Sequence, residues 1–309
     1  MMPAFRTLRT RALKGALPLA FMAAHPLAGA HAQPVTLHVR PSAADPRITE
    51  ADSAHLVKYT PGKDAAPLLL FLPGTNGFPR EMEFHDTALD LGYRVISLAY
   101  ITRVAVAAVC TGERLAADPD CAAHFRQQRI YGDAPTRVID DQPQDAIVSR
   151  LTTLLRYLVR SDTAGHWEQY LDDDKPRWNR IAVAGQSQGG GMAEFIGQRE
   201  LVARVISFSG GWDYSAPGKI ANWYSSKGVT PPDRWFATYH VEEPTAGAMA
   251  EICNALGIPR AHQFALREPV RAGKTAHAEG LNNTVYRNIW ITMLGFTPPA
   301  SGRTAPGPD

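Results

Sequence analysis

A serine flanked by glycines is the residue in this chain whose setting most favours chemistry. Gly185-Gln186-Ser187-Gln188-Gly189 follows an apolar run at 180–184 and precedes a segment at 192–196 with the composition of a helix. A G-x-S-x-G sequence between a strand and a helix is typical of a strained turn that exposes the serine hydroxyl. Ser187 is therefore a candidate nucleophile for acyl transfer, which also needs a base, an orienting acid and oxyanion donors. The alternative is a serine in an ordinary tight turn.

The elements that must position this serine alternate along the chain. Apolar runs predict strands at 68–72, 94–100, 181–184, 205–209, 235–240 and 263–266, and helical spacing predicts helices within 80–91, 143–160 and 289–294. Such alternation indicates a mostly parallel sheet with helices on both faces. Functional side chains in such a sheet gather where the strands end, at the carboxyl edge.

The chain resembles the α/β-hydrolase superfamily over roughly residues 68–294, most specifically in the strand, the G-x-S-x-G turn and the helix around Ser187. The resemblance implies an α/β-hydrolase fold, with a mostly parallel central sheet, helices on both faces and loop or cap insertions, for a domain spanning 33–297. It also implies the chain order nucleophile, acid, histidine. The implied activity is that of a secreted, bacterial-type serine esterase or lipase.

A histidine toward the C-terminus would supply the base. His277 lies in a polar segment, 273–280, that we predict to be a loop before the last helix. It would take the Ser187 proton and return it to the leaving group. His262 comes too early, before a predicted strand, and His240 ends a strand, where a structural role is the simpler interpretation.

The acid should follow the strand that ends at His240. Glu242 and Glu243 both do, and we predict Glu243 as the acid, with Glu242 pointing to solvent. Most members of the superfamily use aspartate, but either carboxylate can hold the imidazole in one tautomer. Glu242 and Asp213, which follows the earlier strand 205–209, remain alternatives.

Two backbone N–H groups must face the developing oxyanion. By the resemblance, one belongs to Gln188 and the other to the turn 73–77 after the first predicted strand, most simply to Thr75. The turn has Pro-Gly where the superfamily often has His-Gly, which is harmless because the donor is a backbone group. An ordinary Pro-Gly turn is the alternative.

Two segments interrupt the alternation and are predicted insertions. Residues 101–142 are loop-like and rich in Asp, Pro and Gln, whereas 212–234 carries an aromatic cluster of Trp212, Tyr214, Trp223 and Tyr224. The aromatic side chains would either line a substrate pocket or pack within the insertion. The pairs His85-Asp86 and Asp140-Asp141 are interpreted as solvated surface charges.

Residues 1–32 are predicted to be a cleaved export signal. A basic stretch is followed by a short apolar run and by Ala30-His31-Ala32, a small-x-small cleavage site. The run is interrupted by prolines and is about half the ~20 residues of a membrane span, although an uncleaved anchor is the alternative. We expect cleavage near Ala32 and a secreted or periplasmic protein. The tail 298–309, rich in Pro, Gly, Ser and Ala, is predicted to be flexible.

Charge gives no reason to expect nucleic acid or an anionic membrane as a partner. The whole chain carries +2, but residues 1–32 hold four positive and no negative side chains, so the mature chain is near −2. No later stretch is apolar enough to span a bilayer.

Export makes a disulfide plausible. Cys110 and Cys121 flank a polar segment and are the predicted pair, whereas Cys253 is predicted to be a buried free thiol. No spacing resembles a zinc site, and no metal or cofactor is expected.

The sequence therefore predicts a secreted serine hydrolase that cleaves a small-molecule or polymer ester through an acyl-enzyme on Ser187. A peptidase or an acyltransferase would use the same residues. An exported binding protein without catalytic activity is the third alternative.

Overall fold

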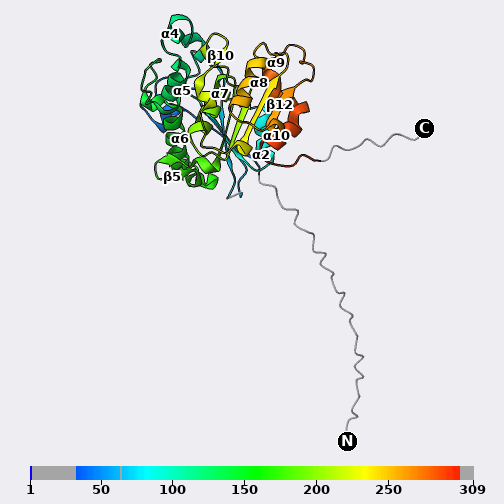
Figure 1. The fold of residues 1–309 in the computed structure, drawn as a ribbon. Coiled ribbons are helices and arrows are strands. Elements are labelled where there is room, and N and C mark those ends of the chain that lie inside the picture. Colours follow the sequence, from blue (N-terminus) through cyan, green and yellow to red (C-terminus); the bar gives the residue numbers. More distant parts are fainter. Residues whose placement is uncertain (2–32, 63–64, 300–309) are drawn as a thin grey trace, which may run out of the picture. The chain divides into compact units, whose positions relative to one another are not determined.

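The computed structural model describes residues 1, 33–62 and 65–299 (Figure 1). The predicted export signal, 1–32, and the predicted tail, 298–309, lie almost entirely outside these residues. Within the described part of the chain, no helix has the length and apolar character needed to cross a membrane.

An eight-stranded sheet forms the centre of the fold. Its order is β1-β2-β4-β3-β7-β8-β11-β12, in which β2 runs antiparallel to both neighbours and every other pair is parallel. The strands are β1 Val35–Val39, β2 His55–Tyr59, β3 Leu68–Leu72, β4 Arg94–Ser97, β7 Ile181–Gln186, β8 Arg204–Phe208, β11 Trp235–His240 and β12 Gln263–Leu266. Two small hairpins, β5 Leu171–Asp172 with β6 Lys175–Pro176 and β9 Tyr214–Ala216 with β10 Lys219–Ile220, lie outside it. The expected α/β-hydrolase fold is confirmed.

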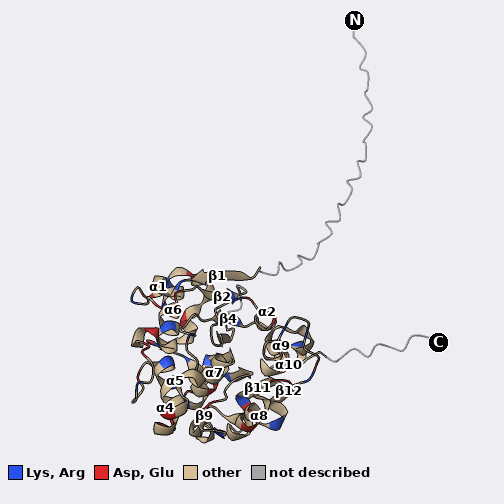
Figure 2. Ribbon diagram, turned by 90° about the horizontal axis from the view of Figure 1, so that it is seen from above, with Lys and Arg blue, Asp and Glu red and all other residues tan. Residues whose placement is uncertain are grey.

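Helices cover both faces of this sheet, as Figure 2 shows from above. They are α1 Pro41–Ala44, α2 Glu83–Asp90, α3 Val106–Val109, α4 Gly112–Ala117, α5 Cys121–Tyr131, α6 Ile147–Ser161, α7 Gln188–Arg199, α8 Ala246–Ala255, α9 Ala276–Asn282 and α10 Arg287–Met293.

Side chains of β3 show how the two faces are filled. Leu68, Leu70 and Leu72 belong to one apolar core together with residues of α5, α6, α7 and α8. Leu69 and Phe71 belong to a second core with residues of α2, α9 and α10. Because successive strand residues point to opposite faces, a continuous apolar run is what a doubly covered strand requires.

The interpretation of 101–142 as loop is wrong, because this segment contains α3, α4 and α5. On α5 the buried residues include Arg126 and Arg129, whose guanidinium groups pair with the buried carboxylates of Asp213 and Asp141. A helix that buries charges in ion pairs lacks the apolar stripe on which sequence prediction depends. The surface interpretation of Asp141 and of His85 is likewise wrong, since both are buried.

A disulfide joins two parts of the segment 101–142. Cys110, after α3, and Cys121, at the start of α5, are bonded with their Cα atoms 5.6 Å apart, and Cys253 is a buried free thiol. Both cysteine predictions are confirmed.

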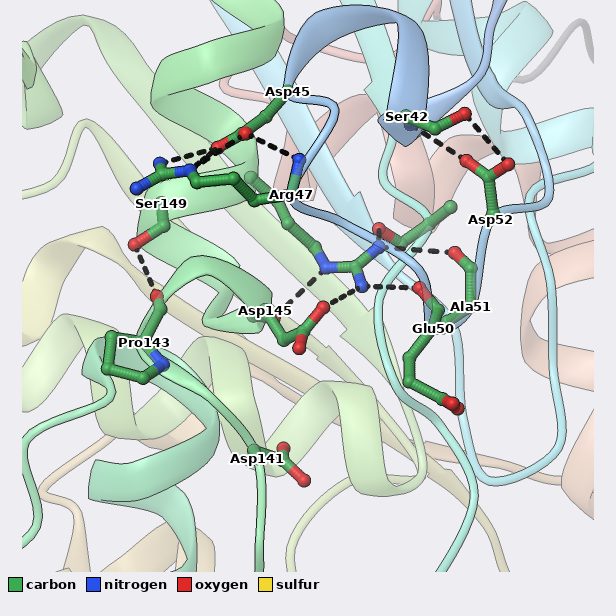
Figure 3. A network of polar contacts seen from close by, with 12 residues as sticks. Ser42, Asp45, Arg47, Glu50, Ala51, Asp52, Asp141, Pro143, Asp145 and Ser149 are labelled. Carbon is green, nitrogen blue, oxygen red and sulfur yellow. Dashed lines mark hydrogen bonds and ion pairs between the residues drawn. The ribbon is translucent and has the colours of Figure 1, made fainter.

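A buried arginine fastens the segment between β1 and β2 to α6. The Arg150 guanidinium donates to the Glu50 carbonyl at 2.6 Å and to the Ala51 carbonyl at 3.1 Å, and it also pairs with Asp145 at 2.7 Å. Figure 3 labels these three partners. The Arg150 site is thus filled by carbonyl groups and one carboxylate, so this network is structural.

Candidate active site

The turn that carries Ser187 is strained. β7 ends at Gln186 and α7 begins at Gln188, and Ser187 between them has φ 56° and ψ −124°. A Cβ on Gly185 would lie 2.2 Å from the Gly189 carbonyl oxygen. The close approach of these two glycines explains why the turn needs them, and it leaves Ser187 at the carboxyl edge of the sheet.

The turn is also packed against its neighbouring strands. The Ser187 N–H donates to the Phe208 carbonyl of β8 at 2.9 Å. A Cβ on Gly189 would lie only 2.0 Å from the Leu72 carbonyl oxygen of β3. The position of Ser187 is therefore fixed from both sides.

His277 and Glu243 lie in contact. His277 Nδ1 is 2.6 Å from Glu243 Oε2, while Oε1 accepts from Ser209 Oγ at 2.6 Å and from the His240 N–H at 2.8 Å. Burial raises the pKa of Glu243, but these hydrogen bonds outweigh it and lower that pKa below its ordinary value. The carboxylate thus stays ionised and orients the imidazole through Nδ1.

His277 lies in the first turn of the short helix α9, so the predicted loop at 273–280 is wrong in its second half. Its carbonyl accepts from Gln186 Nε2 at 2.8 Å, which ties α9 to the residue before Ser187. The Trp212 ring packs edge-on to the imidazole with a centroid distance of 5.8 Å. Within the described residues, no hydrogen bond joins Ser187 Oγ to the His277 ring.

The alternative acids are placed differently. Asp213 accepts from Arg126 Nε at 2.6 Å and from Arg126 Nη2 at 2.8 Å, and its Oδ2 also accepts from Trp223 Nε1 at 3.1 Å. Glu242 is exposed. Of the three candidate acids, the structure brings Glu243 to His277.

The other candidate bases are held by backbone groups. His240 Nε2 lies 2.8 Å from the Glu268 carbonyl oxygen, and His262 Nδ1 lies 3.1 Å from that of Trp235. Both contacts fit the structural interpretation of these rings.

Thr75 and Gln188 line the same cavity as Ser187. The turn 73–77 packs closely on the serine, because a Cβ on Gly74 would lie 3.0 Å from Ser187 Cβ. The two predicted oxyanion donors thus belong to segments that meet at the candidate nucleophile.

Thr102, which was not predicted from the sequence, links these two segments. Its carbonyl oxygen accepts from the Asn76 N–H at 3.3 Å and from Gln188 Nε2 at 3.4 Å, and its hydroxyl donates to the Gly77 carbonyl at 2.9 Å. Gln188 Oε1 in turn accepts from the Val106 N–H at 3.0 Å. The only available sequence signal is that Thr102 follows a strand, β4.

A cavity of about 680 Å³ opens beside Ser187 and is walled by both predicted insertions. One wall comes from α3, α4 and α5, and the other from residues 211–218. Of the aromatic cluster, Trp212 and Tyr214 line the cavity, whereas Trp223 and Tyr224 are buried in the core. Two of the four aromatic side chains thus line a cavity, and the other two pack inside the protein.

The class of the fold follows from this arrangement. A mostly parallel eight-stranded sheet with β2 reversed, helices on both faces and a strained serine turn between β7 and α7 is an α/β-hydrolase fold.

Comparison with known proteins gives similar folds at low identity. No family model matches the chain, and no curated protein matches it. A putative dienelactone hydrolase from Klebsiella pneumoniae is 11% identical, with 85% of this chain and 98% of that chain covered and a TM-score of 0.44. S-formylglutathione hydrolase from Staphylococcus aureus is 10% identical, with coverages of 86% and 98% and a TM-score of 0.45. The acylaminoacyl peptidase of Pyrococcus horikoshii is 12% identical, with coverages of 81% and 38% and a TM-score of 0.46. Because the identities are 12% or lower and the TM-scores are below 0.5, these names describe only the proteins that carry them.

Proposed function

We propose that the protein is an exported serine hydrolase that cleaves esters through an acyl-enzyme on Ser187. The observation that carries the proposal is the 2.6 Å contact between His277 Nδ1 and the buried Glu243 carboxylate, tied through Gln186 to the strained serine turn. A nucleophile, a base and an orienting acid meeting at one sheet edge are what acyl transfer requires.

In the proposed reaction, Ser187 Oγ attacks the ester carbonyl carbon while His277 Nε2 takes its proton. Glu243 keeps the imidazole in the tautomer with the proton on Nδ1 and stabilises the imidazolium that forms. The Ser187–His277 hydrogen bond closes in the reactive complex, as such bonds often do.

The tetrahedral oxyanion would be stabilised by the backbone N–H groups of Gln188 and Thr75. His277 then gives its proton to the departing alkoxide oxygen, which leaves an acyl-enzyme on Ser187. In the second half of the reaction, water attacks the carbonyl carbon of the acyl-enzyme while His277 takes its proton. His277 then returns this proton to Ser187 Oγ, which releases the carboxylic acid product and restores the hydroxyl.

Two features support export to an oxidising compartment. The Cys110–Cys121 disulfide is typical of exported proteins, and the N-terminal sequence has the pattern of a cleaved signal. Mass determination of the mature N-terminus of the secreted protein would test this part of the proposal, with Gln33 as the expected first residue.

Labelling with a fluorophosphonate probe tests the nucleophile. We expect one adduct, on the peptide that contains Ser187, and no adduct in Ser187→Ala. Ser215→Ala is the matched control, because Ser215 lines the same cavity but donates its hydroxyl to the Ile220 carbonyl. A Ser187→Ala protein that labels as fast as the unchanged protein would contradict the proposal.

A further inference from the structure

We propose that the cavity beside Ser187 binds the acyl part of the ester and selects uncharged apolar acyl groups much longer than acetyl. The inference rests on the proposed function for its chemistry, and on the cavity walls for its specificity.

The walls of the cavity are mostly apolar and come from both insertions. Lining residues that share this character are Ala105, Val106, Ala107, Leu115, Ala116, Pro119, Ala122, Trp212, Ala216 and Pro217. The volume of about 680 Å³ lies within the range that encloses a drug-sized ligand, roughly 300–1,000 Å³. An acetyl group would leave most of this space unfilled.

The position of the base decides which half of the ester enters the cavity. His277 must give its proton to the leaving oxygen, so the alcohol part lies on the side of the imidazole. The cavity is lined by Ser187, Gln188 and Thr75, but not by His277. The acyl part, which stays on the serine when the alcohol leaves, is therefore the part that enters the cavity.

Charge at the cavity wall disfavours an anionic acyl group. Arg126 and Asp213 both line the cavity, and the guanidinium is already bound by two contacts to that carboxylate and one to the Gln188 carbonyl. Both side chains are buried. The carboxylate of an anionic acyl group would therefore lose its hydration next to Asp213, whose own carboxylate already binds the Arg126 guanidinium, and this desolvation would weaken its binding. A neutral acyl chain meets no such cost.

Hydrolysis of p-nitrophenyl acetate, butyrate and octanoate measures the length preference. We expect kcat/KM to rise with chain length, with octanoate at least about tenfold above acetate, because each buried methylene contributes up to roughly fourfold. The p-nitrophenyl monoester of octanedioic acid, which has the same length and a terminal carboxylate, should fall at least about tenfold below octanoate. A flat length profile, or equal rates for the neutral and charged chains, would overturn the proposal.

Two pairs of adjacent exposed alanines provide matched variants. Ala116 on α4 and Ala107 on α3 line the cavity, whereas their neighbours Ala117 and Ala108 are exposed outside it. Ala116→Trp or Ala107→Trp should lower the octanoate-to-acetate ratio of kcat/KM by about tenfold, by filling the space that the chain needs. Ala117→Trp and Ala108→Trp should leave that ratio within about twofold. Equal effects within each pair would contradict the assignment of the cavity.

Binding without chemistry separates this inference from the proposed function. Calorimetric titration of Ser187→Ala should detect octanamide but not acetamide, and Ala116→Trp in the same background should weaken octanamide binding. If octanamide binds but no ester is cleaved, the hydrolase proposal fails and the apolar site stands. If esters are cleaved without preference for length and octanamide does not bind, the cavity assignment fails and the hydrolase proposal stands.

Discussion

Two turns at the carboxyl edge of the sheet each carry a buried carboxylate, but they differ in the partner of that carboxylate. The turn after β8 places Asp213 against Arg126, and the turn after β11 places Glu243 against His277. A guanidinium does not act as a base, whereas a neutral imidazole can accept a proton and return it. The partner, more than the carboxylate, therefore decides which turn can take part in proton transfer.

The surroundings of the two acids reinforce this difference. Asp213 belongs to a buried ion pair that joins α5, which carries Arg126, to the turn following β8. Glu243 is buried too, but the His277 side chain beside it is 36% exposed, which leaves the imidazole accessible from the site. The Asp213 pair is enclosed by the fold, whereas the imidazole beside Glu243 is partly open to solvent.

Of the substitutions in these two turns, replacement of Glu243 should give the largest effect on catalysis. Glu243→Gln leaves the shape of the side chain but removes the charge that orients His277, so we expect kcat for ester hydrolysis to fall by about 10³- to 10⁴-fold. Thermal unfolding, monitored by circular dichroism, should change little by comparison. A kcat within about tenfold of the unchanged protein would show that another carboxylate serves as the acid.

Asp213→Asn should show the opposite pattern. Removing one partner of a buried ion pair leaves the Arg126 charge uncompensated, and we expect a loss of about 3–5 kcal/mol in the free energy of unfolding. Measured on the folded fraction, kcat should stay within about tenfold. Urea unfolding of this variant and of Glu243→Gln compares the contributions of the two turns to stability. A kcat loss as large as that of Glu243→Gln would indicate that Asp213, rather than Glu243, is the catalytic acid.

Replacing both partners tests whether the role of Asp213 is to compensate the buried charge of Arg126. Arg126→Met combined with Asp213→Leu removes both buried charges, so it should recover at least about 1 kcal/mol of the stability lost in Asp213→Asn. A double variant less stable than Asp213→Asn would indicate that the Arg126 contact with the Gln188 carbonyl contributes more than the ion pair.

A third buried carboxylate, that of Glu194, should make folding stability depend on pH. Burial raises the pKa of Glu194 to about 7, against which the hydrogen bond from Ser207 acts only in part. Native Glu194 therefore keeps its proton between its ordinary pKa and about 7, while the unfolded chain releases it. Folding stability should fall as pH rises through this window, by up to about 3 kcal/mol.

Urea unfolding between about pH 5 and pH 7 measures this dependence, with Glu194→Gln as the comparison. Because glutamine does not titrate, the variant should lose less stability than the unchanged protein over the same range. Identical slopes for the two proteins would assign the pH dependence to other groups.

The smallest expected effect concerns Thr102, which links the 73–77 turn to Gln188, the two segments proposed to supply the oxyanion donors. Thr102→Val removes the hydroxyl that holds the Gly77 carbonyl, and a small shift of the 73–77 turn should lower kcat by about tenfold with little change in KM. Thr102→Ser, which keeps the hydroxyl, should restore kcat. Equal losses in both variants would indicate a packing role for Thr102.

Local patterns explain what the sequence predicts correctly. β3, β11 and β12 agree with their predicted bounds because each is an apolar run. The turn at Ser187 is equally local, since its glycines, its strand and its helix are contiguous. β2 was not predicted, because its buried residues include His55 and Lys58, which hold partners that the sequence does not reveal.

Distant partners explain what the sequence does not decide. Arg126 and Asp213 are 87 residues apart, and their pairing depends on α5, which was itself interpreted as loop. Glu243 and His277 are 34 residues apart, so sequence order left Glu242 and Asp213 as rival acids. Thr102 contacts the turn at Gly77 and the side chain of Gln188, which only the folded chain brings together.

We propose that Ser187 is the nucleophile and that the His277–Glu243 pair activates it. The rate of fluorophosphonate labelling at Ser187 tests both roles when it is followed by peptide mass in the unchanged protein, Glu243→Gln and Asp213→Asn. We expect an adduct on Ser187 that forms about 10³-fold more slowly in Glu243→Gln and within about tenfold of the unchanged rate in folded Asp213→Asn. An adduct on another residue, or an unchanged rate in Glu243→Gln, would rule out these roles.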